Sequence, residues 1–119
     1  INAVVDSVRE MYPEKNILGV FQPHLYSRTR DFTADFAQSL SRFDELILLD
    51  IYPARELPIE GVNSKWLLDK ISSKNKQLSS KENLIENILK SNAQIIVVIG
   101  AGDIGEEIEN IKKSLTVEN

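Results

Sequence analysis

The sequence contains no cysteine and only one histidine, His24. The absence of cysteine excludes disulfides, thiolate zinc sites, iron–sulfur clusters and a cysteine nucleophile. A single histidine also excludes a metal site built from several imidazoles. The longest apolar run, Ile95 to Ile99, has the length of a strand and falls far short of the roughly 20 residues that span a bilayer. We therefore expect neither a metal site nor a membrane segment.

Basic side chains are fewer than acidic ones: the sequence has 14 Lys and Arg and 18 Asp and Glu, which gives a net charge of -4. This balance argues against general nucleic-acid binding. All five arginines nevertheless lie in residues 1–60, and the rest of the chain uses only lysine. Because the guanidinium fork recognises carboxylates and phosphates in a bidentate manner, a polar site is expected in the first half.

The 119 residues, with 42% hydrophobic and 27% charged side chains, have the size and composition of one soluble globular domain. The chain has no initiator methionine, and it opens inside a segment of helical periodicity. We therefore expect it to be a piece of a longer protein.

Apolar runs without alternation predict three buried strands, over 17–21, 45–51 and 94–99. A weaker edge strand is expected near Gln77 and Leu78. Apolar spacing and capping residues predict helices over 2–12 and 31–43, from Asn63 or Ser64, from Ser79 with Glu82 as a capping box, and from Asp103 with Glu106 as another. Irregular loops are predicted over 22–30 and 52–62, and a mobile polar connection over 72–77.

Strands that alternate with helices predict a mainly parallel sheet covered on both faces, which makes the fold a three-layer α/β/α, Rossmann-like domain. Four strands are few for this class. The small sheet again suggests that a piece is missing or that a partner domain covers an edge.

Ligands of open parallel sheets bind beyond the carboxyl ends of the strands. The segments that leave the predicted strands there are 22–30, 52–56 and 100–103. They hold the single histidine, three of the five arginines and two of the three tyrosines. Polar loops gather at this edge in any parallel sheet, but arginine is otherwise scarce in the chain. We therefore interpret the edge as facing a ligand.

Arg28 and Arg30 lie just before the helix predicted over 31–43, where anions bind well. For Arg28 we favour a clamp on a carboxylate or phosphate. For Arg30 a solvated pair offset by Asp31 and Asp35 is an equal alternative.

Gly100, Gly102 and Gly105 spell the dinucleotide fingerprint G-x-G-x-x-G between a strand and a helix. The glutamates at positions 106, 107 and 109 would repel a pyrophosphate, so we interpret the motif as a tight turn with Asp103 as the helix cap. Glu56 and Asp103 remain candidates for contact with a ligand amine. The sequence has no P-loop, no nucleophile elbow and no paired carboxylates at a catalytic spacing.

Three motifs resemble the C-terminal domain of the Mur ligases of peptidoglycan synthesis: FQPHLYSRTRDF at 21–32, LDIYPARELPIEGVNS at 49–64 and IGAGDIG at 99–105. They occur in order and span essentially the whole chain. The stretch QPH-x-Y-x-R-T-R is most similar to the branch of the family that adds L-alanine to UDP-N-acetylmuramate.

The resemblance implies a three-domain, ATP-dependent ligase of the bacterial cytoplasm. An N-terminal domain would hold the UDP-sugar, and a central domain would hold ATP and Mg²⁺, neither of which this domain would bind alone. The reaction would pass through an acyl phosphate that the alanine amine attacks. Residues 1–119 would be the amino-acid-binding domain without its first strands, inactive alone, with a strand order of 4-1-2-3. Its partners would be the two substrates and the other domains of the same chain, with no nucleic acid and no membrane.

By position, His24 and Arg28 resemble the amino-acid contacts of the family. Many members carry an arginine where this chain has Leu25, so a second cationic contact is lost or is replaced by Arg30. Arg55 and Glu56 match the Y-P-A-R-E loop without an assigned role. Tyr26 and Asp103 complete the candidates, and none of these residues is expected to be catalytic.

Two alternatives stay open at this point. One is a stand-alone binding or regulatory module on a flavodoxin-like sheet. The other is a domain of a related Mur ligase that adds a different amino acid or a peptide. An intact small enzyme is disfavoured because the sequence lacks a nucleophile, a P-loop and metal ligands.

Overall fold

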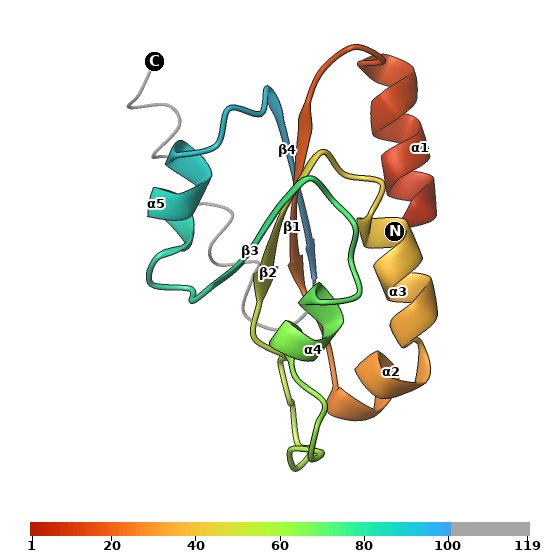
Figure 1. Cartoon of the computed structure of the whole chain (residues 1–119), viewed down its shortest axis with the longest axis vertical. Helices are drawn as coiled ribbons and strands as arrows, with labels where there is room; N and C mark the ends of the chain where they lie inside the picture. Colours follow the sequence, from red (N-terminus) through yellow and green to blue (C-terminus); the bar gives the residue numbers. More distant parts are fainter. Residues whose placement is uncertain (101–119) are drawn as a thin grey trace.

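The computed structural model describes residues 1–100, which form a four-stranded sheet flanked by helices (Figure 1). The elements in chain order are α1 (Asn2–Met11), β1 (Ile17–Gln22), α2 (Tyr26–Asp31), α3 (Thr33–Leu40), β2 (Glu45–Leu49), α4 (Ser64–Leu68), β3 (Asn75–Ser79), α5 (Leu84–Leu89) and β4 (Ile95–Gly100). The helix predicted from Asp103 lies outside the described residues.

The sheet is entirely parallel, in the order β3-β2-β1-β4. This order is the predicted 4-1-2-3, and the predicted fold class is confirmed. The weak edge strand near Gln77 and Leu78 is β3, which pairs with β2. The central pair of strands, β1 and β2, therefore carries the loops that leave the middle of the sheet.

Helices lie on both sides of the sheet (Figure 1), and an apolar layer fills the space between each side and the strands. Helices α1, α3 and α4 bury Val5, Leu40 and Leu67 against one face. Helix α5 buries Leu84 and Ile88 against the other. Because side chains alternate along a strand, each central strand serves both layers, and this explains the unbroken apolar runs in the sequence.

Gly19 in β1 is required by the close approach of Phe43. A Cβ atom at position 19 would lie 2.6 Å from Cδ2 of that ring. The ring is buried, with 2% of its residue surface exposed. The glycine lets the chain that leads from α3 into β2 pack directly on β1.

The helix predicted over 31–43 is wrong in its bounds. The backbone leaves the helical region at Phe32, with φ -114° and ψ 22°, so one predicted helix becomes α2 and α3. Asp31 ends α2 instead of opening a helix, and Phe32 is 51% exposed rather than buried. Segment 22–30 is correspondingly not an irregular loop, because it contains the end of β1 and most of α2.

The apolar stripe predicted for the first helix is only partly buried. Val5 lies in the core and Val8 packs against it, but Met11 is 65% exposed. The capping box of Ser79 and Glu82 is also wrong. Ser79 belongs to β3, where its Oγ accepts from Asn87 Nδ2 at 2.9 Å, and α5 begins only at Leu84.

The polar segment 72–77 is tied down by hydrogen bonds in place of apolar contacts. Ser73 is buried, and its Oγ donates to the carbonyls of Leu40 and Phe43 at 3.1 and 3.0 Å. Asn75 to Gln77 then pair in β3. The second half of segment 72–77 therefore belongs to the sheet and not to a connection.

Candidate functional site

The loops that follow β1 and β2 are joined by backbone hydrogen bonds at the carboxyl edge of the sheet, the edge where the parallel strands end. The Leu25 N–H donates to the Tyr52 carbonyl at 2.9 Å, and the Tyr52 N–H donates to the Pro23 carbonyl at 2.8 Å. His24 and Tyr52 form an isolated parallel bridge, and their rings stack with centroids 5.9 Å apart. These contacts join the two loops into one platform.

Helix α2 rises directly from this platform. Leu25 precedes it with φ 70°, a left-handed backbone that a leucine rarely adopts. The buried Thr29 holds the turn, since its Oγ1 donates to the Leu25 carbonyl at 2.8 Å. Strained residues of this kind concentrate at binding sites, where the surrounding structure enforces them.

His24 and Arg28 line the same small cavity, of about 190 Å³, at the ends of β1 and β4. Phe21, Phe36 and Ile99 give it apolar walls, and Gln22 and Gly100 complete its lining. The cavity is smaller than the ~300–1,000 Å³ of sites for drug-sized ligands. It fits a small ligand with one anionic and one apolar part.

The Arg28 side chain is exposed and makes no hydrogen bond or ion pair with residues 1–100. Arg28 also lines a second cavity, of about 510 Å³, between the start of α1 and α3. The guanidinium is thus a cation at a cavity boundary with no acidic partner in the described part of the chain. Its N–H groups can donate hydrogen bonds to a carboxylate.

Arg30 lies two residues further along the same short helix and is engaged differently. Its Nε contacts Asp31 Oδ1 at 2.8 Å, and both side chains are about half exposed. This hydrogen bond and the charge of Arg30 hold the pKa of Asp31 below its ordinary value. Arg30 lines none of the cavities described above, so the structure does not bring it to Arg28 and His24.

The predicted placement of both arginines before a helix start is wrong. They lie in the last turn of α2, because the helix begins at Tyr26 and not at Asp31. Positions i and i+2 of a helix point in different directions. This geometry separates Arg28 at the cavity from Arg30 at Asp31.

Glu56 points at the first turn of α2. Its Oε1 accepts from the Ser27 N–H at 3.0 Å, and its Oε2 accepts a short hydrogen bond from Ser27 Oγ. The hydrogen bonds of Ser27, first from the hydroxyl and then from the backbone, lower the pKa of Glu56. The carboxylate is therefore occupied by the protein itself.

The remaining candidates lie around this platform. Tyr26 is half-buried at the start of α2, next to Ser27. Arg55 is exposed and makes no hydrogen bond or ion pair with residues 1–100. Asp103 lies outside the described residues.

Gln22 is a residue of this edge that the sequence reasoning missed. It is 5% exposed, and its Oε1 has no donor among residues 1–100. It is paired in register with Gly100 of β4. In the sequence, Gln22 stood out only as the first residue of segment 22–30 and of the QPH motif.

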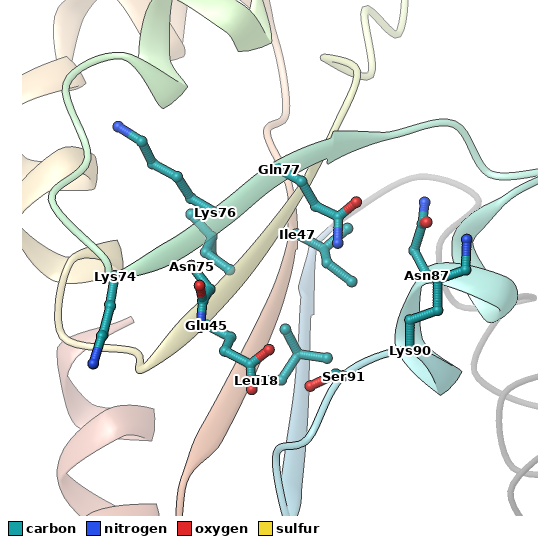
Figure 2. A pocket seen from close by; sticks show the side chains of 11 residues that line it. Leu18, Glu45, Ile47, Lys74, Asn75, Lys76, Gln77, Asn87, Lys90 and Ser91 are labelled. Carbon is teal, nitrogen blue, oxygen red and sulfur yellow. The ribbon is translucent and has the colours of Figure 1, made fainter.

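A polar cavity of about 350 Å³ lies elsewhere, between β2, β3 and α5 (Figure 2). Two of the lysines that line it are engaged by the protein itself. Lys76 Nζ donates to the Leu68 and Ile71 carbonyls at 3.0 and 2.6 Å, and Lys90 pairs with Glu86 at 3.5 Å. The cavity at the carboxyl edge is therefore the better candidate.

Residues 1–100 contain no group of three His, Asp or Glu side chains that could hold a metal ion. Within the same range, no helix is both long enough and apolar enough to traverse a bilayer.

The fold and the carboxyl edge define a class: a parallel α/β domain with a small cavity, lined by His24 and Arg28, where its strands end. The family model described as "Mur ligase, glutamate ligase domain" matches residues 1–112. The chain belongs to this family, as its C-terminal domain.

Several relatives named UDP-N-acetylmuramate–L-alanine ligase are highly similar. The chain is 66% identical over 115 residues to the one from Flavobacterium psychrophilum, which covers 97% of this chain and 26% of that protein. It is 64% identical over 118 residues to the one from Christiangramia forsetii, covering 99% and 26%. The relative from Porphyromonas gingivalis is 50% identical over 116 residues, covering 97% and 25%. The chain thus spans about a quarter of the length of these relatives.

Proposed function

We propose that this chain is the amino-acid-binding domain of an ATP-dependent ligase that joins L-alanine to UDP-N-acetylmuramate in the bacterial cytoplasm, in the synthesis of peptidoglycan precursors. One observation carries the proposal. Residues His24 and Arg28 line one small cavity at the carboxyl edge, and the arginine has no acidic partner within residues 1–100. The names and identities of the relatives support the choice of substrates.

The lining of the cavity matches the parts of a small amino acid. The Arg28 guanidinium binds the carboxylate through its fork, and the walls of Phe21 and Phe36 receive a methyl group. His24, held against Tyr52, supplies a hydrogen-bonding group in a fixed orientation. Binding the carboxylate at one end leaves the amine directed outward, and such positioning accelerates a bimolecular step.

ATP and Mg²⁺ do not fit the described part of this domain. The sequence has no P-loop, and residues 1–100 offer no acidic cluster for the ion. We therefore assign the nucleotide and the UDP-sugar to other domains of the same protein. The work of this domain is to bind the amino acid and to orient it.

Kinetics of the full-length ligase test the proposal. Loss of a charge-assisted pair costs about 1.5–3 kcal/mol, so Arg28→Ala should lower kcat/KM for alanine by about 10–150-fold. The KM for UDP-N-acetylmuramate should stay unchanged. Arg28→Lys should restore only part of the loss, since lysine lacks the fork.

Arg30→Ala is the matched control, because Arg30 lies on the same helix but pairs with Asp31. It should leave alanine kinetics near those of the unmodified enzyme. Normal alanine kinetics in Arg28→Ala would remove Arg28 from the site. An equal rise in both KM values would assign it to contact between domains instead.

A further inference from the structure

The loop after β2 contributes a carboxylate to the helix that carries Arg28. Glu56 lies 29 residues beyond Ser27 in sequence, yet both of its carboxylate oxygens accept hydrogen bonds from that residue. The Glu56 N–H donates to the Pro53 carbonyl at 2.8 Å, and Ala54 within this turn has φ 53°. The tight turn over 53–56 therefore aims the Glu56 side chain at α2.

Helix α2 has no cap of its own. The residue that precedes it, Leu25, has an apolar side chain, and no side-chain hydrogen bond caps the helix from that position. The first N–H groups of a helix need acceptors from outside the helix. Glu56 supplies one at Ser27, so it acts as the cap from a distant part of the chain. A carboxylate also suits this end of a helix electrostatically.

Arg28 follows Ser27 directly. Helix α2 has only six residues, and short helices depend on their tertiary contacts. If the first turn frays, Arg28 loses the backbone geometry that places it at the cavity of about 190 Å³ with His24. The hydrogen bond from Thr29 Oγ1 to the Leu25 carbonyl holds the same turn from within the helix.

We propose that Glu56 is a positioning residue for amino-acid binding: by capping α2 through Ser27, it holds Arg28 at the cavity without touching the substrate. This role rests on the proposed function of Arg28. In this role, the Glu56 carboxylate of the Y-P-A-R-E loop binds Ser27 of the protein and does not contact the amine of the ligand. The loop after β2 then influences substrate binding indirectly, by holding the helix that carries Arg28.

Steady-state kinetics of the full-length ligase, with both substrates varied, test this role. Glu56→Ala should raise the KM for alanine about tenfold, since small misplacements of a binding group weaken positioning strongly. The KM for UDP-N-acetylmuramate should stay constant, and kcat at saturating alanine should change less than about twofold. Glu56→Gln keeps one carbonyl acceptor for the Ser27 N–H and should rescue part of the loss.

Two further variants sharpen the test. Glu60→Ala is the matched control, because Glu60 is an exposed glutamate of the same loop with no hydrogen bond or ion pair to residues 1–100. It should behave as the unmodified enzyme. Ser27→Ala combined with Glu56→Ala should be no worse than Glu56→Ala alone, since both changes remove the same contact.

Hydrogen exchange of the full-length protein gives a second readout. In Glu56→Ala, exchange should quicken in the peptide covering residues 24–30 and stay unchanged there in Glu60→Ala. A normal alanine KM in Glu56→Ala, or equal losses with both substrates, would overturn the positioning role. If Arg28→Ala also has normal alanine kinetics, the proposed function fails as well. If Arg28→Ala alone is impaired, only the role of Glu56 fails.

Discussion

The two edges of the sheet are both polar, but they use charge in opposite ways. At the amino edge, where the strands begin, Arg9 pairs with Asp44 at 3.1 Å and donates to the Arg42 carbonyl at 2.9 Å. Asp44 also accepts from the N–H of Ile17 at 2.8 Å. Arg42 in turn pairs closely with Asp6 of α1. These ion pairs and hydrogen bonds stabilise the fold, because they connect α1 and the segment before β2 to the start of β1.

At the carboxyl edge, two arginines have no acidic partner within residues 1–100. Arg28 and Arg55 make no ion pair with any of residues 1–100. Arg28 also lies at a cavity. Glu56 binds the backbone N–H and the hydroxyl group of Ser27, and Asp31 pairs with Arg30, so neither carboxylate neutralises Arg28. The difference teaches that a paired charge in this domain serves the fold, whereas an unpaired charge beside a cavity is available to a ligand.

The largest expected effect comes from the core that both edges share. Leu48 in β2 is fully buried between them, so Leu48→Ala should lower the free energy of unfolding by about 2–5 kcal/mol. Denaturant unfolding measures this loss. Alanine kinetics of the fraction that remains folded should be nearly normal, because Leu48 does not line the cavity at the carboxyl edge. A specific loss of alanine affinity would mean that the edge is not an independent unit.

A smaller effect is expected at the amino edge. Asp44→Ala removes the acceptor for the first N–H of β1 and the partner of Arg9, and both side chains are about one-third exposed. The free energy of unfolding should fall by about 1–2 kcal/mol, while the KM for alanine stays unchanged. Asp44→Asn keeps an acceptor and should recover part of the stability. A raised KM for alanine in Asp44→Ala would break the contrast between the edges.

The smallest effect concerns pH at the carboxyl edge. Ser27 hydrogen bonds, with a further contribution from the charge of Arg30, lower the pKa of Glu56 below its ordinary 4.5. A lowered folded-state pKa adds stability at pH above the unfolded value, and this stability is lost as pH falls through the folded value. The difference in unfolding midpoint between the unmodified protein and Glu56→Gln should therefore be constant near neutral pH. It should shrink below about pH 4.5 and then vanish.

A midpoint difference that grows on acidification would contradict the assigned direction of the Glu56 pKa. Glu60→Gln provides the reference, because Glu60 is exposed and makes no hydrogen bond or ion pair within residues 1–100.

Local pattern was sufficient for the architecture. The unbroken apolar runs at 17–21 and 45–51 predicted buried parallel strands, and β1 and β2 confirm them. The resemblance of the motifs to the Mur ligases supplied the strand order, which the sheet also confirms. The strands could be predicted because a strand that is buried on both faces needs apolar residues at successive positions, and this pattern can be seen without knowledge of distant contacts.

Local pattern failed for the helix predicted over 31–43. The spacing of Phe32, Phe36 and Leu40 reads as one helical stripe, yet the backbone breaks at Phe32. The separate helix α2 that precedes the break is held at its start by a tertiary contact, the cap from Glu56 at Ser27. Periodicity cannot register such a contact, because the acceptor comes from residues far along the chain.

The sequence by itself determined that this is a parallel α/β domain of the Mur ligase type, with its histidine and most of its arginines near one edge. Only the tertiary structure decided that Arg28 faces a cavity while Arg30 pairs with Asp31, and that Glu56 caps α2 rather than standing open to a ligand. The physical reason is that unbroken apolar runs identify the buried strands, whereas the partner of a polar side chain depends on where two separate loops place their backbones.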